Sequence, residues 1–358
     1  MLEIKIKSKL PGFTLDVSFS VNQEILAILG PSGSGKTMTL RCIAGLTHPD
    51  EGFVRLNGKV LLDTAKGVNL PARQRKVGFV FQNYSLFPHL TVNQNIAYGI
   101  RHLPVNEAND KVSDLLDKMH VKQLGDRLPR HLSAGQQQRV AVARALAPEP
   151  DVLLLDEPFS ALDTMVKERM YLVLQAVQHF FKGDMLFVTH DLSEGYKLSS
   201  RIAVFESGRI VQHDHKERVI FNPSNNTVAR LVGFKNLMAG TVTEINETAA
   251  VIKVPELGPV KTVISKNTGL AVNQRVTVGI RPEYIQMRSQ PGENTFESTL
   301  DRKVEGVTAT DFYFLASKPG TTPHSIMAIL SKPESALVRE GRPNHLYFPP
   351  EHVVVIAE

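Results

Sequence analysis

The stretch that decides the fold is "ILAILGPSGSGKTMTLRCIAGL", which runs from Ile25 to Leu46. It opens with a short run of β-branched and large apolar residues, which is typical of a strand buried on both faces. A glycine-rich loop follows, and after the loop the residue pattern is helical. A strand, a tight loop and a helix in this order predict the phosphate-binding turn of an α/β protein.

The loop fits the pattern G-x-x-x-x-G-K-[ST] in full. Its residues are Gly30, Pro31, Ser32, Gly33, Ser34, Gly35, Lys36 and Thr37. Backbone N–H groups of such a loop, together with the positive end of the helix, bind phosphate oxygens. Lys36 adds a positive charge near the β- and γ-phosphates, and the Thr37 hydroxyl is placed to ligate Mg²⁺. The loop therefore predicts a bound nucleoside triphosphate, against the alternative of a plain glycine turn before a helix.

Three further apolar runs, at 77–81, 152–156 and 186–190, end in polar residues. Strands of this kind alternating with helical patterns predict an α/β fold with a parallel sheet. Ligands of such sheets bind beyond the carboxyl ends of the strands, where these polar residues lie. Residues from about 86 to 150 are expected to form a helical insertion. Its segment "ANDKVSDLLDKM" is amphipathic, with these apolar residues at helical spacing: Val112, Leu115, Leu116 and Met119.

The segment "DVLLLDEPFSALD" places two adjacent acids after an apolar run. The Asp156 carboxylate can reach Mg²⁺ directly or through a water molecule, because it ends a predicted buried strand. Glu157 follows at once and is positioned to polarise a water for attack on a γ-phosphate. The pair therefore divides into a metal holder and a base. A solvated acidic pair at a strand end is the alternative.

The segment "LSAGQQQRVAVARAL" (132–146) resembles the signature segment of ABC transporter ATPases, usually Leu-Ser-Gly-Gly-Gln. Five further features agree with that family in order and spacing. They are the loop at 30–37, Gln82 in "VFQNYSLFPHLTV", the acids at 156–157, "SALD" at 160–163 and "VTHD" at 188–191. The resemblance covers residues 1–235. It implies an ABC-type P-loop NTPase fold and ATP hydrolysis with Mg²⁺.

The resemblance also implies partners. Two copies of the chain would sandwich two ATP molecules in a head-to-tail dimer, which would move separate membrane permease subunits. The Ser133 hydroxyl and the helix that follows it can face an anion. In the family, the surface of Ser133, Gly135 and Gln136 meets the γ-phosphate held by the other copy, and Asp163 helps to organise the interface. Ala134 stands where the family pattern has glycine, and we expect its methyl group to be tolerated.

Three more residues have two interpretations each. A lone histidine such as His190 is often structural, but the resemblance implies a hydrogen bond to the γ-phosphate and the attacking water. Gln82 is either a surface amide or, by resemblance, a catalytic residue that senses Mg²⁺ and water near the permease contact. Phe13 is either the aromatic platform for adenine or a core or turn residue, since "LPGFTLDVSF" is shorter than the common family spacing.

The turn-rich stretch "FNPSNNTVARLVGFKN" (221–236) predicts a boundary that gives domains 1–235 and 236–358. Short alternating segments separated by turns follow it and predict a small all-β domain of one or two barrels. They are "GTVTEI", "AAVIKV", "VKTVI", "RVTVGI", "SIMAIL", "HLYF" and "HVVVIA". With "VGIRPE" (278–283), this part is similar to the OB/TOBE-like barrel extension of importer ATPases.

Composition sets limits on function. The 358 residues are 42% hydrophobic, as in globular proteins of two or more domains. No run of about 18 apolar residues is present to span a membrane, and "MLEIKIKSKL" lacks an apolar signal core. The single cysteine, Cys42, fits a reducing compartment. The resemblance implies a peripheral protein on the cytoplasmic face of the cell membrane.

The net charge of +5 favours an ordinary solvated surface. No nucleic-acid partner is expected, and an ABC-type ATPase of nucleic-acid maintenance is disfavoured. Such proteins carry long heptad coiled coils, and none is visible between Gln82 and Leu132. The β extension disfavours an exporter. The importer class further implies an external solute-binding protein as an indirect partner.

The cargo is open. The sequence resembles molybdate and tungstate importer ATPases most closely, while sulfate, ferric-ion and polyamine importers share much of the pattern. In some members of this group the β domain binds the transported oxyanion. Four basic residues here either take part in such a site or are surface charges of a dimerisation domain. They are Lys261, Arg275, Arg281 and Arg302.

Overall fold

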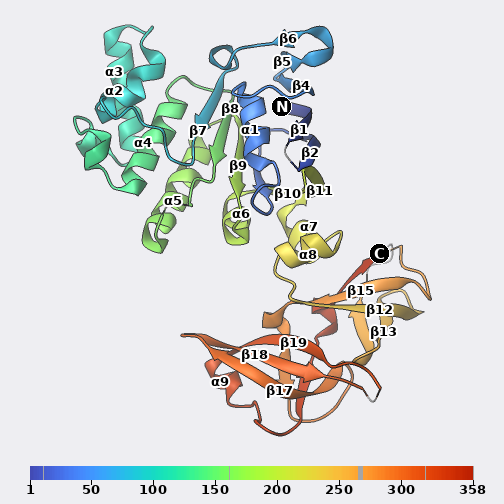
Figure 1. The fold of residues 1–358 in the computed structure, drawn as a ribbon. Helices are drawn as coiled ribbons and strands as arrows, with labels where there is room; N and C mark the ends of the chain where they lie inside the picture. The colour runs from blue at the N-terminus through green and yellow to red at the C-terminus, as the bar shows by residue number, and fades with distance from the viewer. Residues whose placement is uncertain (11, 161, 265–268, 319, 358) are drawn as a thin grey trace. The chain divides into compact units, whose positions relative to one another are not determined.

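The computed structural model describes residues 1–10, 12–160, 162–264, 269–318 and 320–357. The chain divides into two compact units, Met1–Lys216 and Glu217–Glu358 (Figure 1). The sequence places its boundary at 235, after two short helices that lie next to this division. They are α7 (Lys216–Phe221) and α8 (Asn226–Leu231).

The first unit is built on one mixed sheet (Figure 1). Over the described residues its strand order is β6-β5-β4-β1-β2-β11-β10-β3-β9-β8-β7. Neighbours β3 (Ile25–Leu29), β9 (Asp184–Thr189), β8 (Val152–Asp156) and β7 (Val77–Val80) pair in parallel. Every residue of β8 and β9 is buried, as expected for strands covered on both faces. The predicted α/β class is confirmed, and each apolar run forms one of these strands.

The other part of the sheet is largely antiparallel and is absent from the sequence prediction. Its strands are β1 (Leu2–Leu10), β2 (Phe13–Val21), β4 (Glu51–Leu56), β5 (Lys59–Asp63) and β6 (Val68–Asn69). The strands β10 (Arg201–Glu206) and β11 (Arg209–His215) connect the two parts. The alternation in "LEIKIKSKL" is the missed signal, because every second residue of β1 and β2 is buried.

Helices connect the strands of this sheet. α1 (Lys36–Ala44) follows the glycine-rich loop and contacts β7 and β8. The expected insertion contains α2 (Val92–Ala97), α3 (Val105–Lys118) and α4 (Ala134–Leu146). The apolar face predicted for α3 is buried, and α4 packs on α5 (Thr164–Phe180). The helix α6 (Leu192–Leu198) follows β9 and packs on β3. None of the helices in the described part of the chain is long and apolar enough to cross a membrane.

The second unit is all-β apart from short helical turns, as predicted. One sheet has the order β14-β13-β12-β15-β21 and the other β16-β20-β17-β18-β19. The bounds of the first are β12 (Asn236–Ile245), β13 (Ala249–Val254), β14 (Gly258–Val263), β15 (Arg275–Ile280) and β21 (Val354–Ala357). Those of the second are β16 (Gln286–Arg288), β17 (Thr295–Glu305), β18 (Ala309–Ala316), β19 (His324–Ser331) and β20 (Asn344–Tyr347). The short helix α9 (Lys332–Ser335) follows β19, and both sheets contribute to a shared apolar core.

Two buried asparagines bind the outermost strands of the second unit. Asn236, 1% exposed, accepts a hydrogen bond from the Met327 N–H (2.8 Å) and donates to the Met327 carbonyl (2.9 Å). Asn294 makes the same pair of bonds with Lys261, at 2.7 Å each. Met327 lies in β19 and Lys261 in β14, which end their sheets. Each side-chain amide therefore takes the place of a neighbouring peptide group.

We expect Asn236→Ala to destabilise the second unit by about 1–3 kcal/mol, because it leaves partly buried backbone groups of β19 without these partners. Urea unfolding of the full chain measures this loss, and the Met327 amide should exchange faster with solvent. Glu244→Ala is the matched control, since it removes an exposed side chain from the same strand. We expect the control to change stability by less than about 0.5 kcal/mol. Equal stability of the two variants would contradict the assigned role of Asn236.

Candidate functional site

The glycine-rich loop joins the end of β3 to the start of α1. Gly35, the residue before α1, has a φ of 99°, and a Cβ there would lie 2.7 Å from Leu15 Cδ1. Glycine is therefore required both by the backbone and by the space. The Lys36 side chain is 5% exposed, and its Nζ donates to the carbonyls of Gly30 (2.8 Å) and Pro31 (2.9 Å). These bonds hold the ammonium group inside the loop.

Thr37 and Asp156 meet where α1 begins and β8 ends. The Thr37 hydroxyl donates to Asp156 Oδ1 at 2.7 Å, and Asp156 is 4% exposed. Burial raises the pKa of Asp156, although the hydrogen bond from Thr37 acts in the opposite direction. Burial also lowers the pKa of Lys36. A carboxylate and a hydroxyl side by side suit Mg²⁺, which prefers oxygen ligands and completes its shell with phosphates and water.

Glu157 is the point at which three loops converge. Gln82, which follows β7, donates from Nε2 to Glu157 Oε2 at 3.1 Å. His190, which follows β9, has its Nδ1 3.9 Å from the same oxygen. The Glu157 backbone has a φ of 46°, unusual for a residue with a side chain, and its N–H donates to the Val188 carbonyl. The structure thus brings together the three residues that the sequence nominates as catalytic.

Phe13 lies beside the glycine-rich loop. A Cβ on Gly35 would lie 3.5 Å from Phe13 Cε2, and a Cβ on Gly208 would lie 2.7 Å from Phe13 Cδ2. The ring is partly buried, so part of it remains accessible. This position fits a platform for a nucleotide base and equally fits packing of the loop against β2.

The signature residues form a second group at the starts of α4 and α5. Ser133 caps α4: its hydroxyl accepts from Gln136 N (3.4 Å), and Gln136 Oε1 accepts from Ser133 N (2.9 Å). A Cβ on Gly135 would lie 2.4 Å from Val166 Cγ1 of α5. Asp163 caps α5 by accepting from the Val166 N–H (3.0 Å).

The glycine requirement in this segment lies at Gly135, because the neighbouring Ala134 is exposed. Within the chain, the alanine therefore meets no steric conflict. Ala161 of the "SALD" segment lies outside the described residues.

Two buried groups near the site were missed by the sequence analysis. Gln138 of α4 is fully buried, and its Nε2 donates to the carbonyl of Pro158, the residue after Glu157. The Thr189 hydroxyl donates to the buried Glu194 carboxylate and fixes the chain just before His190. Gln138 lies within the signature segment and Thr189 within "VTHD", so the sequence could have identified both as residues that support the site.

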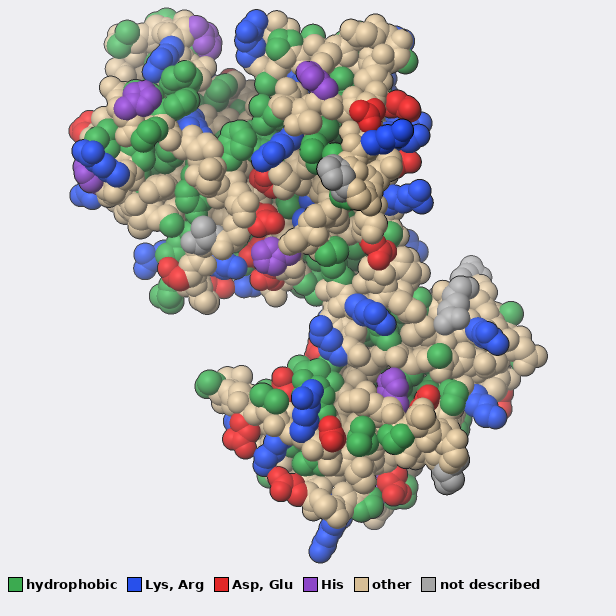
Figure 2. All heavy atoms as spheres, viewed as in Figure 1, with side chains coloured by type: hydrophobic (Ala, Val, Ile, Leu, Met, Phe, Trp, Pro, Cys, Tyr) green, Lys and Arg blue, Asp and Glu red, His purple; other side chains and the backbone are tan. Residues whose placement is uncertain are grey.

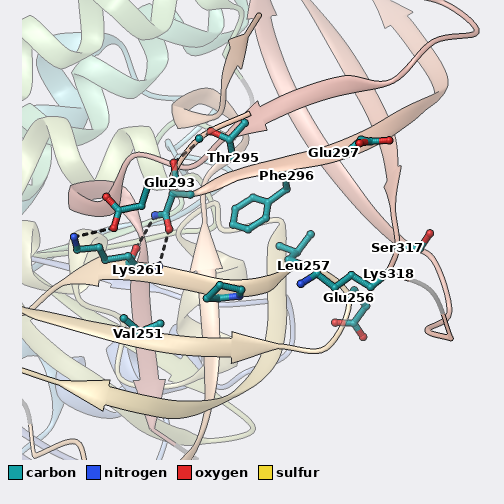
Figure 3. A pocket seen from close by; sticks show the side chains of 13 residues that line it. Val251, Glu256, Leu257, Lys261, Glu293, Thr295, Phe296, Glu297, Ser317 and Lys318 are labelled. Carbon is teal, nitrogen blue, oxygen red and sulfur yellow. Dashed lines mark hydrogen bonds and ion pairs between the residues drawn. The ribbon is translucent and has the colours of Figure 1, made fainter. Parts of the chain in front are cut away.

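The four basic residues of the second unit lie on different elements and have different surroundings. Lys261 forms an ion pair with Glu293 (2.9 Å) at the pocket of about 500 Å³ in Figure 3. Arg281 is buried and donates to the Ile220 carbonyl. Arg302 lies over the ring of Tyr313. Arg275, at the start of β15, is exposed.

The pocket of Figure 3 carries three carboxylates and two ammonium groups. They belong to Glu256, Glu293, Glu297, Lys261 and Lys318. Excess negative charge disfavours a bound oxyanion here. Over the faces shown in Figure 2, acidic and basic side chains are interspersed on each unit.

Comparisons with known proteins agree with an ATP-binding site at this position. The family model described as "ABC transporter" matches residues 14–160. The spermidine/putrescine import ATP-binding protein PotA of Oleidesulfovibrio alaskensis is 39% identical over 307 residues, 83% of this chain and 79% of that protein. The molybdate/tungstate import ATP-binding protein WtpC of Archaeoglobus fulgidus is 42% identical over 237 residues, 66% of this chain and 96% of that protein.

A solved structure is similar as well. It is the dimeric ATP-binding cassette MJ0796 in a post-hydrolysis state bound to ADP and Pi. The TM-score is 0.52 at 29% identity, and the match covers 60% of this chain and 99% of that one.

We expect Asp156→Asn to stabilise the ligand-free protein at neutral pH. The pKa of Asp156 is raised from 3.8, so ionisation is unfavourable in the fold. That cost is fully present above the folded-state pKa and disappears below the unfolded-state pKa, where both states are protonated. Asparagine keeps an oxygen for the Thr37 hydroxyl. Thermal unfolding near pH 8 should show a rise in Tm of roughly 2 °C that shrinks as the pH approaches 4.

The control for this prediction is Asp110→Asn, which neutralises an exposed carboxylate on α3. We expect it to leave Tm within about 1 °C of the parent at both pH values. A lower Tm for Asp156→Asn near pH 8 would mean that attraction to Lys36 and Arg41 outweighs burial.

Proposed function

Because the chain belongs to the ABC transporter family, we propose that it is the ATP-hydrolysing subunit of an importer. It works as a pair of copies on the cytoplasmic face of the membrane and drives solute uptake through separate permease subunits. An external solute-binding protein delivers the cargo. The observation that carries the proposal is the meeting of Lys36, Thr37, Asp156 and Glu157 at the carboxyl ends of β3 and β8.

The phosphate chain of ATP lies along residues 30–37. The loop N–H groups and the N-terminus of α1 bind the phosphate oxygens, and Lys36 moves from loop carbonyls to the β- and γ-phosphates. The Ser34 hydroxyl is buried and has no partner among the described residues, which leaves it available inside the loop. Thr37, Asp156 and Gln82 would hold Mg²⁺, which would neutralise phosphate charge.

Hydrolysis requires a water molecule in line with the γ-phosphate. Glu157 accepts a proton from that water, whose oxygen forms a bond to phosphorus while the bond to the ADP oxygen breaks. His190 and Gln82 flank the same carboxylate and orient the water and the γ-phosphate. The products are ADP and inorganic phosphate.

One copy does not complete the site. The surface of Ser133, Gly135 and Gln136 in one copy faces the γ-phosphate bound by the other, and Asp163 lies at this interface. ATP contacts both copies only in the closed pair, so its binding shifts the population toward closure. Loss of the γ-phosphate removes that bridge and the pair reopens. Phe13 is assigned to the adenine base, since its ring lies beside the loop.

We propose molybdate or tungstate as the cargo. The motifs resemble those of molybdate and tungstate importer ATPases, and WtpC is 42% identical over 237 residues. A specific observation favours a polyamine as the second candidate. The similarity to PotA extends over 83% of this chain and so continues beyond the ATPase part.

Transport by the chain reconstituted with its permease and binding protein tests the cargo. Molybdate, tungstate, sulfate, ferric citrate and spermidine are compared at equal concentrations. ATP-dependent uptake of molybdate or tungstate supports our assignment. Uptake of spermidine alone contradicts it and establishes the second candidate. Failure of every solute, with intact ATP hydrolysis, would contradict the importer class.

We expect Glu157→Gln to lower kcat by about 10²–10⁴-fold, because it removes the general base. ATP binding should persist, and ATP should hold the variant as a dimer in size-exclusion chromatography. Glu149→Gln is the matched control, since Glu149 also has a left-handed backbone (φ 53°) but pairs with Lys111 away from the loop. Normal turnover by Glu157→Gln would exclude Glu157 as the base.

A further inference from the structure

The chain between β7 and α2 contains an uncommon backbone. Tyr84 has a φ of 60° and Ser85 a φ of 45°, so two consecutive residues with side chains are left-handed. This conformation is unfavourable for L-residues and persists only where the surroundings enforce it. Tyr84 is also 7% exposed, with a hydroxyl that has no partner among the described residues. A local turn contributes to this conformation, because the Tyr84 N–H donates to the Phe81 carbonyl (2.9 Å) and the Ser85 hydroxyl donates to Asn83 Oδ1 (2.7 Å). The two carbonyls of Tyr84 and Ser85 are held from outside the loop.

Three anchors hold this loop, which we call the Gln82 loop (residues 82–91). Its start is fixed by β7. Its end is fixed by Asn95, a fully buried residue of α2 that accepts from Phe87 N (2.9 Å) and donates to the Leu90 carbonyl (2.9 Å). The left-handed residues lie between these two anchors and are held by a third.

The third anchor is Arg144 of α4. Its guanidinium donates to the Ser85 carbonyl at 2.7 Å and to the Tyr84 carbonyl at 2.9 Å. It also lies 5.4 Å from the centre of the Phe87 ring. Arg144 is half-buried, and this burial lowers the pKa of its guanidinium. One planar fork thus binds both residues whose backbone is unfavourable.

We propose that Arg144 is a positioning residue for ATP hydrolysis. It holds the Gln82 loop in the shape that places Gln82 Nε2 at 3.1 Å from Glu157 Oε2. Without Arg144, the left-handed pair relaxes and Gln82 leaves the carboxylate. The inference rests on the roles proposed above for Gln82 and Glu157. It also links α4, whose first turn carries Ser133 and Gly135, to the loop that reaches the base.

A structural role for Arg144 is the competing explanation, and Arg139 provides the comparison. Arg139 lies on the same helix, and burial lowers its pKa as well. Its guanidinium donates to the carbonyls of Met119 (3.2 Å) and His120 (3.1 Å), next to the end of α3, and to Gly135 (3.3 Å). Arg139→Met therefore removes a similar half-buried arginine whose hydrogen bonds do not involve the Gln82 loop.

The experiment measures kcat and KM for Mg·ATP with the full chain. The variants are Arg144→Met, Arg144→Lys, Arg139→Met, Gln82→Ala and the double variant of Arg144→Met with Gln82→Ala. We expect Arg144→Met to lower kcat by roughly 10–100-fold, because a catalytic group misplaced by about 1 Å costs up to that factor. KM should stay within about twofold, since Arg144 contacts no residue of the phosphate loop. Arg144→Lys should fall between, because one ammonium replaces a two-pronged donor.

The double variant gives the sharpest readout. If Arg144 acts through Gln82, adding Arg144→Met to Gln82→Ala lowers kcat no further. Multiplied losses in the double variant would overturn the proposal, and so would equal losses of kcat in Arg139→Met and Arg144→Met. Full kcat in Arg144→Met, with a reduced kcat in Gln82→Ala, would overturn the role of Arg144 and leave that of Gln82 intact. Full kcat in Gln82→Ala would instead overturn the assignment of Gln82, and this inference with it.

A rescue variant separates loop shape from stability. Ser85→Gly removes the penalty of a positive φ, so it should restore part of the kcat lost in Arg144→Met. Tm of every variant is measured in parallel. Restored Tm without restored kcat would contradict the positioning role.

Discussion

Parallel pairing of β3, β9, β8 and β7 is the constraint on which the rest of the molecule depends. Parallel strands end at the same edge of a sheet, so the chain leaves all four at one place. The glycine-rich loop, Glu157, His190 and Gln82 each follow one of these strands at once or one residue later, and Asp156 is the last residue of β8. Thr37, Gln82 and His190, which are far apart in the sequence, therefore meet around the carboxylates of Asp156 and Glu157.

The site that results is electrostatically unfavourable in the free protein. Asp156 and Lys36 are both nearly inaccessible to water, and burial disfavours the charged form of each. Opposite charges and hydrogen bonds offset this in part, since Thr37 donates to Asp156 and loop carbonyls accept from Lys36. A polyphosphate and its cation supply the remaining compensation. The residues that bind most strongly are thus the ones that the fold alone stabilises least.

The sequence predicts those parts of the structure whose cause is local. Lys36 and Thr37 belong to one continuous strand, loop and helix, so their placement follows from residue type and spacing alone. Arg144 could not be found in this way, because its contact with Ser85 spans 59 residues. β17 was missed for a different reason: most of its residues after Ser298 are exposed and polar, so its second half lacks an apolar alternation. Neither the sequence motifs nor the site geometry identifies the cargo, because the described site residues act on ATP.

The asparagine hydrogen bonds at β14 and β19 affect how this protein associates with other molecules. An outer strand presents unpaired N–H and C=O groups, and these recruit strands of other molecules into open-ended aggregates. Asn236 and Asn294 occupy such groups with their own amides, at one position on β19 and one on β14. A protein that gathers as pairs on a membrane reaches high local concentration. Its all-β unit can then lie close to neighbouring copies without pairing strands with them, so association stays reversible.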